Sequence, residues 1–304
     1  MVQPKPVNLR LIDARGRALS SAQVNQLVPR ASVDIQQAIS QIEPLLAEVK
    51  ASGESAIVDV TIARDGVDPR PLKVTKEELA RAVAELSPSL RRAIEEAIER
   101  VFKVSRANLP QDTTVKLAEG ALVHQRWQPV DSVGLYVPGG KAVYPSSVIM
   151  NVVPAQVAGV QRLALASPAQ KDFNGRPHPT VLATAALLGV EDVYCMGGPA
   201  AIAAFAYGIP QIDLEPVSLV TGPGNIFVAA AKRALRGIIG IDSEAGTTEI
   251  LVLADDSANA RFIAYDLVSQ AEHDEAAASV LVTDSVELAN AVINELTDIV
   301  SATS

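Results

Sequence analysis

The chain has 304 residues, of which 48% are hydrophobic and 20% charged, a composition typical of a packed soluble protein with room for two domains. Its formal net charge of −9 excludes the basic surface that nucleic-acid binders need. A single cysteine, Cys195, excludes a disulfide framework within the chain, and no apolar run reaches membrane-spanning length. The sequence therefore favours a cytoplasmic protein with neither a membrane nor a nucleic acid as its partner.

Residues 1–110 are predicted to be helical. Pro44 is expected to kink or restart one helix, and Gly53 is expected to end the next segment. Thr75, which precedes two acidic residues, and Ser87-Pro88 are predicted helix starts. No pattern here indicates chemistry, so we interpret the region as a scaffold and as an arm for dimer contacts.

The pattern changes to strands over residues 115–129, with Glu119-Gly120 as the turn of a hairpin. His124 lies in this stretch and alternates with apolar neighbours. A lone histidine in a strand lacks the further ligands that a metal requires, so we predict a structural role for it.

Short apolar strands alternate with helices from residue 132 to the end of the chain. This alternation is typical of βαβ units and predicts a mostly parallel sheet with helices on both faces. The predicted strands are residues 133–137, 163–166, 192–196, 217–220, 249–253 and 279–282, and the predicted helices are residues 148–158, 181–188, 200–207, 226–235, 258–272 and 286–296.

Three predicted strands end in glycine-rich turns that open a helix. In an open α/β sheet, ligands bind at the carboxyl ends of the strands, and helix starts beside glycine expose N–H groups to phosphates. Together the turns predict a nucleotide-type ligand, although none has the dinucleotide-binding or P-loop spacing. The alternative is that each glycine serves only its turn. The turns are Pro138-Gly139-Gly140, Gly197-Gly198-Pro199 and Gly222-Pro223-Gly224-Asn225.

Several single residues near these turns have two interpretations each. Tyr136 either lies against a flat ring or is an ordinary strand aromatic. Asn225 follows the third turn and is a candidate helix cap. Thr248 either offers its hydroxyl to a ligand or ties down its own loop. Lys232 and Arg233 are predicted to be solvated.

Cys195 suggests a thiolate nucleophile for an aldehyde. It lies inside an apolar strand, however, and no histidine is near it in the sequence. Because free cysteine in such a setting is usually buried and inert, we predict a structural residue.

The segment Ser269-Gln270-Ala271-Glu272-His273-Asp274 is the most concentrated set of ligand-type and acid–base side chains in the chain. Gln270 and His273 are three residues apart on a predicted helix and therefore share one face. An imidazole and an amide oxygen can together hold a divalent metal. The alternative is a solvated polar helix end, since two ligands do not complete a metal site.

Four segments, in this order and spacing, resemble the motifs of histidinol dehydrogenases. The resemblance runs from near the N-terminus to the last predicted strand, and it implies a zinc-dependent, cytoplasmic homodimer of histidine biosynthesis. Such an enzyme oxidises L-histidinol to L-histidine through histidinal, with NAD as the oxidant. The segments are residues 134–147 (GLYVPGGKAVYPSS), 221–225 (TGPGN), 245–249 (AGTTE) and 269–274 (SQAEHD).

The resemblance also implies two incomplete Rossmann-like domains with mostly parallel sheets, one inserted in the other. Residues 1–133 with 249–304 would form the first domain, which includes the helical N-terminal region. Residues 134–248 would form the inserted NAD-binding domain.

The same resemblance assigns roles to residues at matching positions. Tyr136 and Asn225 would contact NAD. Thr248 would contact the substrate. Gln270 and His273 would bind zinc, and the metal would hold the imidazole and amine of the substrate.

Two departures from the family pattern stand out. Ala200 occupies a position where the family has a glutamine that helps to bind NAD. Family members also continue beyond this chain, into a part that carries a Glu-His proton-shuttling pair and the remaining zinc ligands. The sequence therefore predicts a C-terminally truncated member that contains no catalytic residue of that pair and whose last helix, residues 286–296, exposes part of its apolar face. The alternative is a catalytically impaired homologue that acts only as an NAD-binding or dimerisation module.

Overall fold

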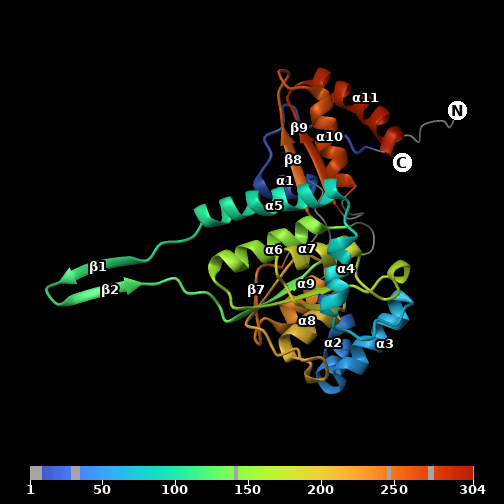
Figure 1. Cartoon of the computed structure of the whole chain (residues 1–304). Coiled ribbons are helices and arrows are strands. Elements are labelled where there is room, and N and C mark those ends of the chain that lie inside the picture. Colours follow the sequence, from blue (N-terminus) through green and yellow to red (C-terminus); the bar gives the residue numbers. More distant parts are fainter. Residues whose placement is uncertain (1–8, 29–34, 140–142, 245–247, 273–276, 304) are drawn as a thin grey trace. The chain divides into compact units, whose positions relative to one another are not determined.

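The computed structural model describes residues 9–28, 35–139, 143–244, 248–272 and 277–303 (Figure 1). Contacts divide the chain into two compact units. We call residues 35–245 the large unit, and residues 1–34 with 246–304 the small unit. Among the described residues, no helix combines the length and apolar character needed to cross a membrane.

A five-stranded sheet forms the centre of the large unit, with the strand order β5-β4-β3-β6-β7 and parallel pairing throughout. The chain builds outward from β3 through β4 to β5 and then continues on the other side of β3 with β6 and β7. The direction in which successive strands are added to the sheet thus changes between β3 and β6. Open α/β sheets bind ligands at such a point. The strands are β3 (Ser132–Tyr136), β4 (Arg162–Ser167), β5 (Asp192–Cys195), β6 (Leu219–Thr221) and β7 (Gly240–Ile241).

Helices cover both faces of this sheet, each face with its own apolar core. Along β3, Val133 and Leu135 join one core and Tyr136 joins the other, because successive strand residues point to opposite faces. The predicted parallel sheet between two helical layers is confirmed. One layer contains α2 (Ile35–Ser52), α3 (Glu54–Asp65), α8 (Gly198–Tyr207) and α9 (Ile226–Leu235), and the other contains α4 (Lys76–Ala84), α5 (Pro88–Ala107), α6 (Pro145–Ala158) and α7 (Pro179–Leu187).

Local sequence signals set several helix ends as predicted. Thr75 caps α4 by accepting a hydrogen bond from the Glu78 N–H at 3.2 Å, and the Glu78 carboxylate accepts one from the Thr75 N–H at 2.8 Å. Ser87 caps α5, and α2 ends immediately before Gly53. Of the two outcomes predicted at Pro44, a kink or a restart, the restart does not occur. Helix α2 continues through Pro44, since the apolar residues around it are buried in the core.

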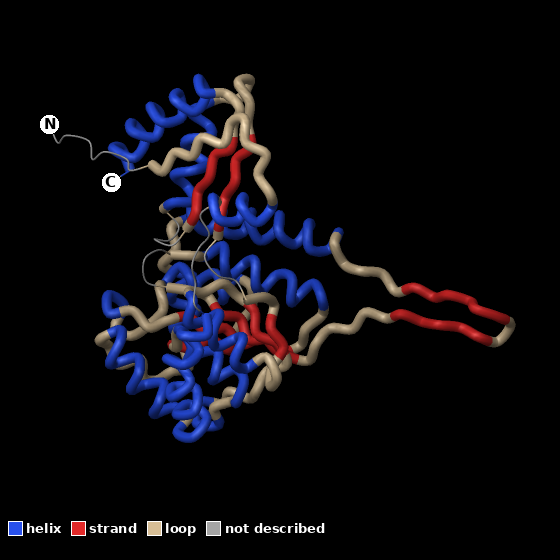
Figure 2. Tube along the Cα trace, turned by 180° about the vertical axis from the view of Figure 1, so that it is seen from behind, coloured by secondary structure: helices blue, strands red, loops and turns tan. Residues whose placement is uncertain are grey.

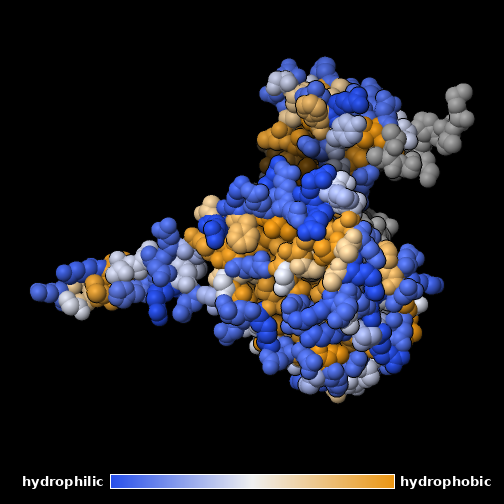
Figure 3. Space-filling model, viewed as in Figure 1, coloured by the Kyte–Doolittle hydropathy of each residue, from blue (hydrophilic) through white to orange (hydrophobic). Residues whose placement is uncertain are grey.

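A hairpin of β1 (Thr113–Ala118) and β2 (Ala121–Gln125) turns at Glu119-Gly120, as predicted. It extends away from the sheet of the large unit (Figure 2). Apolar side chains are exposed along it (Figure 3). The Nδ1 atom of His124 lies 2.9 Å from the Thr114 hydroxyl on the facing strand. His124 therefore has the structural partner that its position in a strand predicted.

The small unit contains a parallel pair of strands and its own apolar core. Leu288, Val292 and Leu296 of α11 are buried in this core, so the apolar face that we expected to be exposed is largely covered. Among the large apolar residues of α11 whose burial is described, Val286 in the first turn is the exposed one, at 43%. The elements are α1 (Ser21–Leu27), β8 (Glu249–Leu253), α10 (Ala260–Ala271), β9 (Ala278–Val282) and α11 (Val286–Thr303).

Candidate functional site

The three glycine-rich turns follow the carboxyl ends of β3, β5 and β6, and Tyr136 connects them. The Tyr136 hydroxyl accepts a hydrogen bond from the Gly198 N–H at 3.1 Å. On the third turn, a Cβ atom added to Gly222 would lie 2.0 Å from the Tyr136 carbonyl oxygen, so only glycine allows this close approach. The last residue of the first turn, Gly140, and the two residues after it lie outside the described residues.

Two positions expected near NAD are buried. Tyr136 is 4% exposed, and burial raises the pKa of its phenol, which therefore stays neutral and holds the turn at Gly198. Ala200, in the first turn of α8, is 1% exposed and belongs to the apolar core. The contact between Tyr136 and NAD stays a prediction.

Asn225 is the N-cap of α9, which confirms the structural interpretation of this residue. Its Oδ1 atom accepts hydrogen bonds from the N–H groups of Phe227 at 3.1 Å and Val228 at 3.2 Å. The residue is exposed, and the cap uses only the oxygen of its amide. The Nδ2 group therefore remains as a donor for a ligand.

Lys232 is buried, so its predicted solvation was wrong, whereas Arg233 beside it is exposed as predicted. The Lys232 Nζ atom donates to the Gly222 carbonyl at 2.5 Å and to Asp242 Oδ1 at 2.7 Å. A lysine is rarely fully buried without a partner, and its partner here is ten residues away in the sequence. No local pattern around Lys232 could have indicated this pair.

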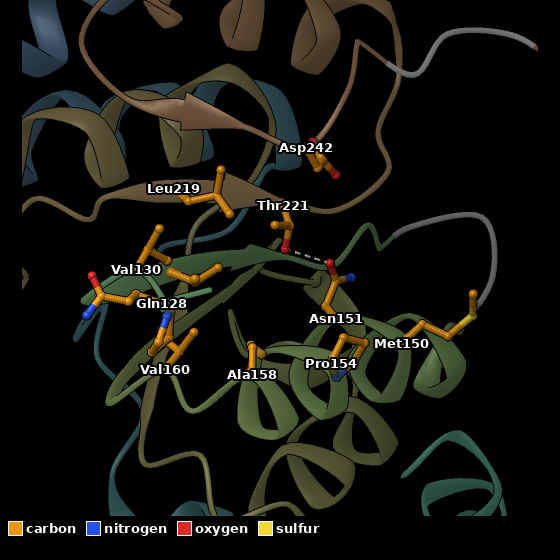
Figure 4. Close-up of a pocket in the computed structure, with 13 residues that line it drawn as sticks. Gln128, Val130, Met150, Asn151, Pro154, Ala158, Val160, Leu219, Thr221 and Asp242 are labelled. Atoms are coloured by element: carbon orange, nitrogen blue, oxygen red, sulfur yellow. Dashed lines mark hydrogen bonds between the residues drawn. The ribbon is translucent and has the colours of Figure 1, made fainter. Parts of the chain in front are cut away.

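A pocket of about 460 Å³ lies beside α6 on the sheet (Figure 4). Asn151, Thr221 and Asp242 form its polar end, and the Thr221 hydroxyl donates to Asn151 Oδ1 at 2.8 Å. Sequence analysis missed this pocket because its lining is spread from Gln128 to Asp242 without a shared motif.

Within the small unit, the structure brings Thr248 and Gln270 together. The Gln270 Nε2 atom donates to the Thr248 hydroxyl at 2.6 Å and to the Thr248 carbonyl at 3.2 Å. This arrangement leaves the Gln270 Oε1 atom as a candidate metal ligand and the Thr248 hydroxyl hydrogen as a donor.

The predicted zinc pair is only half visible, because His273 lies outside the described residues. Among the residues that are described, no three His, Cys, Asp or Glu side chains cluster so that they could hold a metal ion. A zinc site needs three or four protein ligands, so the Gln270 oxygen alone does not form one.

Cys195 is fully buried at the end of β5. Burial raises the pKa of its thiol to about 11, although the Arg176 guanidinium, whose Nη1 donates to Sγ at 3.3 Å, opposes the rise. At neutral pH about one thiol in ten thousand is then ionised, which leaves too little thiolate for a nucleophile. The predicted structural role is confirmed.

We expect the Cys195 thiol of the native chain to resist alkylation. Incubation with iodoacetamide at neutral pH should leave the intact mass unchanged, because the thiol is both buried and protonated. The same incubation in denaturant should add one label per chain. Rapid labelling of the native chain would contradict the structural role.

Comparison with known proteins decides the family. A family model described as histidinol dehydrogenase matches residues 28–304. The chain belongs to the histidinol dehydrogenase family. This confirms the resemblance that its four serial motifs indicated.

Relatives in this family are similar over almost the whole chain. The histidinol dehydrogenase of Leifsonia xyli subsp. xyli is 52% identical over 97% of this chain and 68% of its own length. That of Thermobifida fusca is 54% identical over 94% of this chain and 64% of its own length. A crystal structure of histidinol dehydrogenase from Elizabethkingia anophelis matches with a TM-score of 0.82 at 28% identity, over 93% of this chain and 67% of that one. The chain thus spans about two thirds of the length of these relatives.

Proposed function

We propose that this chain provides the NAD-binding unit and part of the zinc and substrate site of a histidinol dehydrogenase. The reaction is the NAD-dependent oxidation of L-histidinol to L-histidine, carried out in the cytoplasm by a homodimer. The observation that carries the proposal is the family match over residues 28–304. The meeting of glycine-rich turns at the carboxyl ends of β3, β5 and β6 supports it.

We place NAD where the strand order changes direction, between β3 and β6, because open α/β sheets bind ligands at this point. There the 222–225 turn opens α9 and presents the free Nδ2 group of Asn225. When bound, NAD supplies the hydride acceptor, and Asn225 contributes a hydrogen-bond donor that orients the cofactor. Tyr136 contributes indirectly, because its hydroxyl accepts a hydrogen bond from the Gly198 N–H and so fixes the neighbouring turn.

The small unit contributes groups for the substrate. Gln270 is fixed by its bonds to Thr248, which keep its Oε1 atom available, and His273 is the second proposed zinc ligand. Zinc, when bound, would orient the imidazole and amine of histidinol. The Thr248 hydroxyl would donate to a polar atom of the substrate.

We retain the proposal that residues 134–248 are an inserted NAD-binding domain. Its C-terminal boundary is supported by the end of the large unit at residue 245. Helices α2 to α5 precede this insert in the sequence and pack in the same two cores as its strands.

Asn225→Asp tests the cofactor role. Aspartate keeps the capping oxygen, so we expect an unchanged free energy of unfolding. It removes the Nδ2 donor and adds a negative charge beside the phosphates, so NAD affinity should fall by about tenfold or more, measured by calorimetry. Asn259→Asp is the matched control, because Asn259 caps α10 with the same pair of hydrogen bonds. Equal NAD affinity in the two variants would remove Asn225 from the cofactor site.

A turnover assay separates the enzyme from a non-catalytic NAD-binding module. The purified chain, with its zinc content measured, is mixed with NAD and L-histidinol, and NADH is followed by absorbance. Histidinol-dependent NADH formation supports the enzyme. NAD binding without NADH formation supports the module for this chain.

A further inference from the structure

Lys232 and Asp242 together form hydrogen bonds with the carbonyl and the N–H group of one residue, Gly222. The Lys232 ammonium donates to the Gly222 carbonyl at 2.5 Å, and Asp242 Oδ2 accepts from the Gly222 N–H at 2.9 Å. A bond of 2.7 Å between Lys232 Nζ and Asp242 Oδ1 closes the ring of contacts. The two side chains thus form a clamp on the residue that begins the 222–225 turn.

Both arms of the clamp are anchored. Lys232 projects from α9, and its side chain is only 2% exposed. Asp242 follows β7, where its backbone N–H donates to the Val220 carbonyl at 3.2 Å and its Oδ1 accepts from the Ser243 N–H at 2.6 Å. The turn is therefore tied to both the helix that follows it and the strand beside it.

Burial of the lysine charge has a cost that the clamp must offset. Removing an ion from water is unfavourable, and a buried ion pair often adds no net stability over apolar residues of similar size. A defined geometry is the better attested benefit of such pairs. Here the geometry belongs to Gly222, which has a φ of +120° and no side chain of its own to fix the turn.

The clamped turn leads directly to Asn225. Only Pro223 and Gly224 separate the clamped residue from this cap, and Lys232 lies two turns further along the helix that Asn225 starts. Fixing Gly222 to Lys232 therefore sets where the cap and its Nδ2 group lie.

We propose that Lys232 and Asp242 are positioning residues that hold the 222–225 turn in the shape that presents Asn225 to the dinucleotide, without touching the dinucleotide themselves. The identity of the ligand rests on the proposed function, whereas the clamp on the turn does not.

Lys232→Met tests the clamp, because methionine fills much of the buried volume without the ammonium. We expect hydrogen exchange at the Gly222 amide to rise by about tenfold or more, and the Kd for NAD to rise by a similar factor. Arg233→Met is the matched control. It removes a neighbouring cation that pairs with Glu244 at the surface, so neither quantity should change. Asp242→Asn, which alters a partly exposed side chain at constant size, provides the same two measurements if Lys232→Met does not fold.

The outcomes separate this inference from the proposed function. Unchanged exchange at Gly222 in Lys232→Met and Asp242→Asn overturns the clamp. Faster exchange with an unchanged Kd for NAD overturns the positioning role and leaves a purely structural one. A wild-type chain that binds no NAD overturns the proposed function and the ligand half of the inference. Faster exchange at Gly222 together with weaker NAD binding in the clamp variants, with neither change in Arg233→Met, supports both the clamp and its positioning role.

Discussion

Gly222→Ala should lower the free energy of unfolding by about 3 kcal/mol or more. The φ of +120° at this position is strained for any L side chain. The added Cβ atom would also lie 2.0 Å from the Tyr136 carbonyl oxygen and 2.9 Å from its carbonyl carbon. These are backbone atoms at the end of the central strand β3, so they cannot move aside as a flexible side chain would. Urea-induced unfolding, followed by circular dichroism, measures the loss.

Gly189→Ala is the matched control for this change. Gly189 also has a positive φ, +73°, but no atom lies within 4 Å of the position that a Cβ would take. This variant should show only the conformational cost, about 1–2 kcal/mol. The difference between the two variants combines the close approach to Tyr136 with the greater backbone strain of a φ of +120°. Equal losses would show that the turn relaxes away from β3.

The second large effect concerns Phe205 and Gly134. The Phe205 ring occupies the space that a side chain at position 134 would need. Phe205 is fully buried, and a Cβ atom on Gly134 would lie 2.5 Å from its ring. Phe205→Ala should cost about 3–5 kcal/mol by leaving a cavity. Gly134→Ala should cost about 1–3 kcal/mol by overpacking the same space. In the double variant the new methyl group enters the cavity, so the combined loss should be smaller than the sum by about 1 kcal/mol or more.

Ile94→Val provides the control for this double-mutant cycle. Ile94 is buried in the core on the other face of the sheet. Its combination with Gly134→Ala should be additive within about 0.5 kcal/mol. Unfolding curves of the single and double variants give the change in the free energy of unfolding for each step of the cycle. Additivity of Gly134→Ala with Phe205→Ala would contradict direct packing of the two residues.

The sequence predicted those parts of the fold that depend on short-range patterns. Short apolar strands that alternate with helices indicated β3 to β6, and the caps Thr75 and Ser87 indicated where helices start. Strand β7 was missed because the two residues Gly240–Ile241 are too few for periodicity to show. The continuation of α2 through Pro44 was missed because core packing, rather than local preference, decides it.

The candidate site divides in the same way. The rule that ligands bind at the carboxyl ends of strands pointed to the glycine-rich turns. In the structure, Tyr136 connects the turns at Gly198 and Gly222. The burial of Lys232 and its pairing with Asp242 depend on tertiary structure, because α9 and the residue after β7 must both contact the turn at Gly222. A short stretch of sequence does not contain this information. The bond between Gln270 and Thr248, residues 22 apart in the sequence, was unpredicted for the same reason.

Strand β3 admits only one register. Its residues must place Gly134 beneath the Phe205 ring, Leu135 in the opposite core, and the Tyr136 hydroxyl at the N–H of Gly198. A slip of one residue would exchange the two faces and put Val133 or Leu135 where glycine alone fits. Both helical layers and the turn at Gly222 are therefore aligned against this strand, and a single-residue insertion within it would misplace all three together.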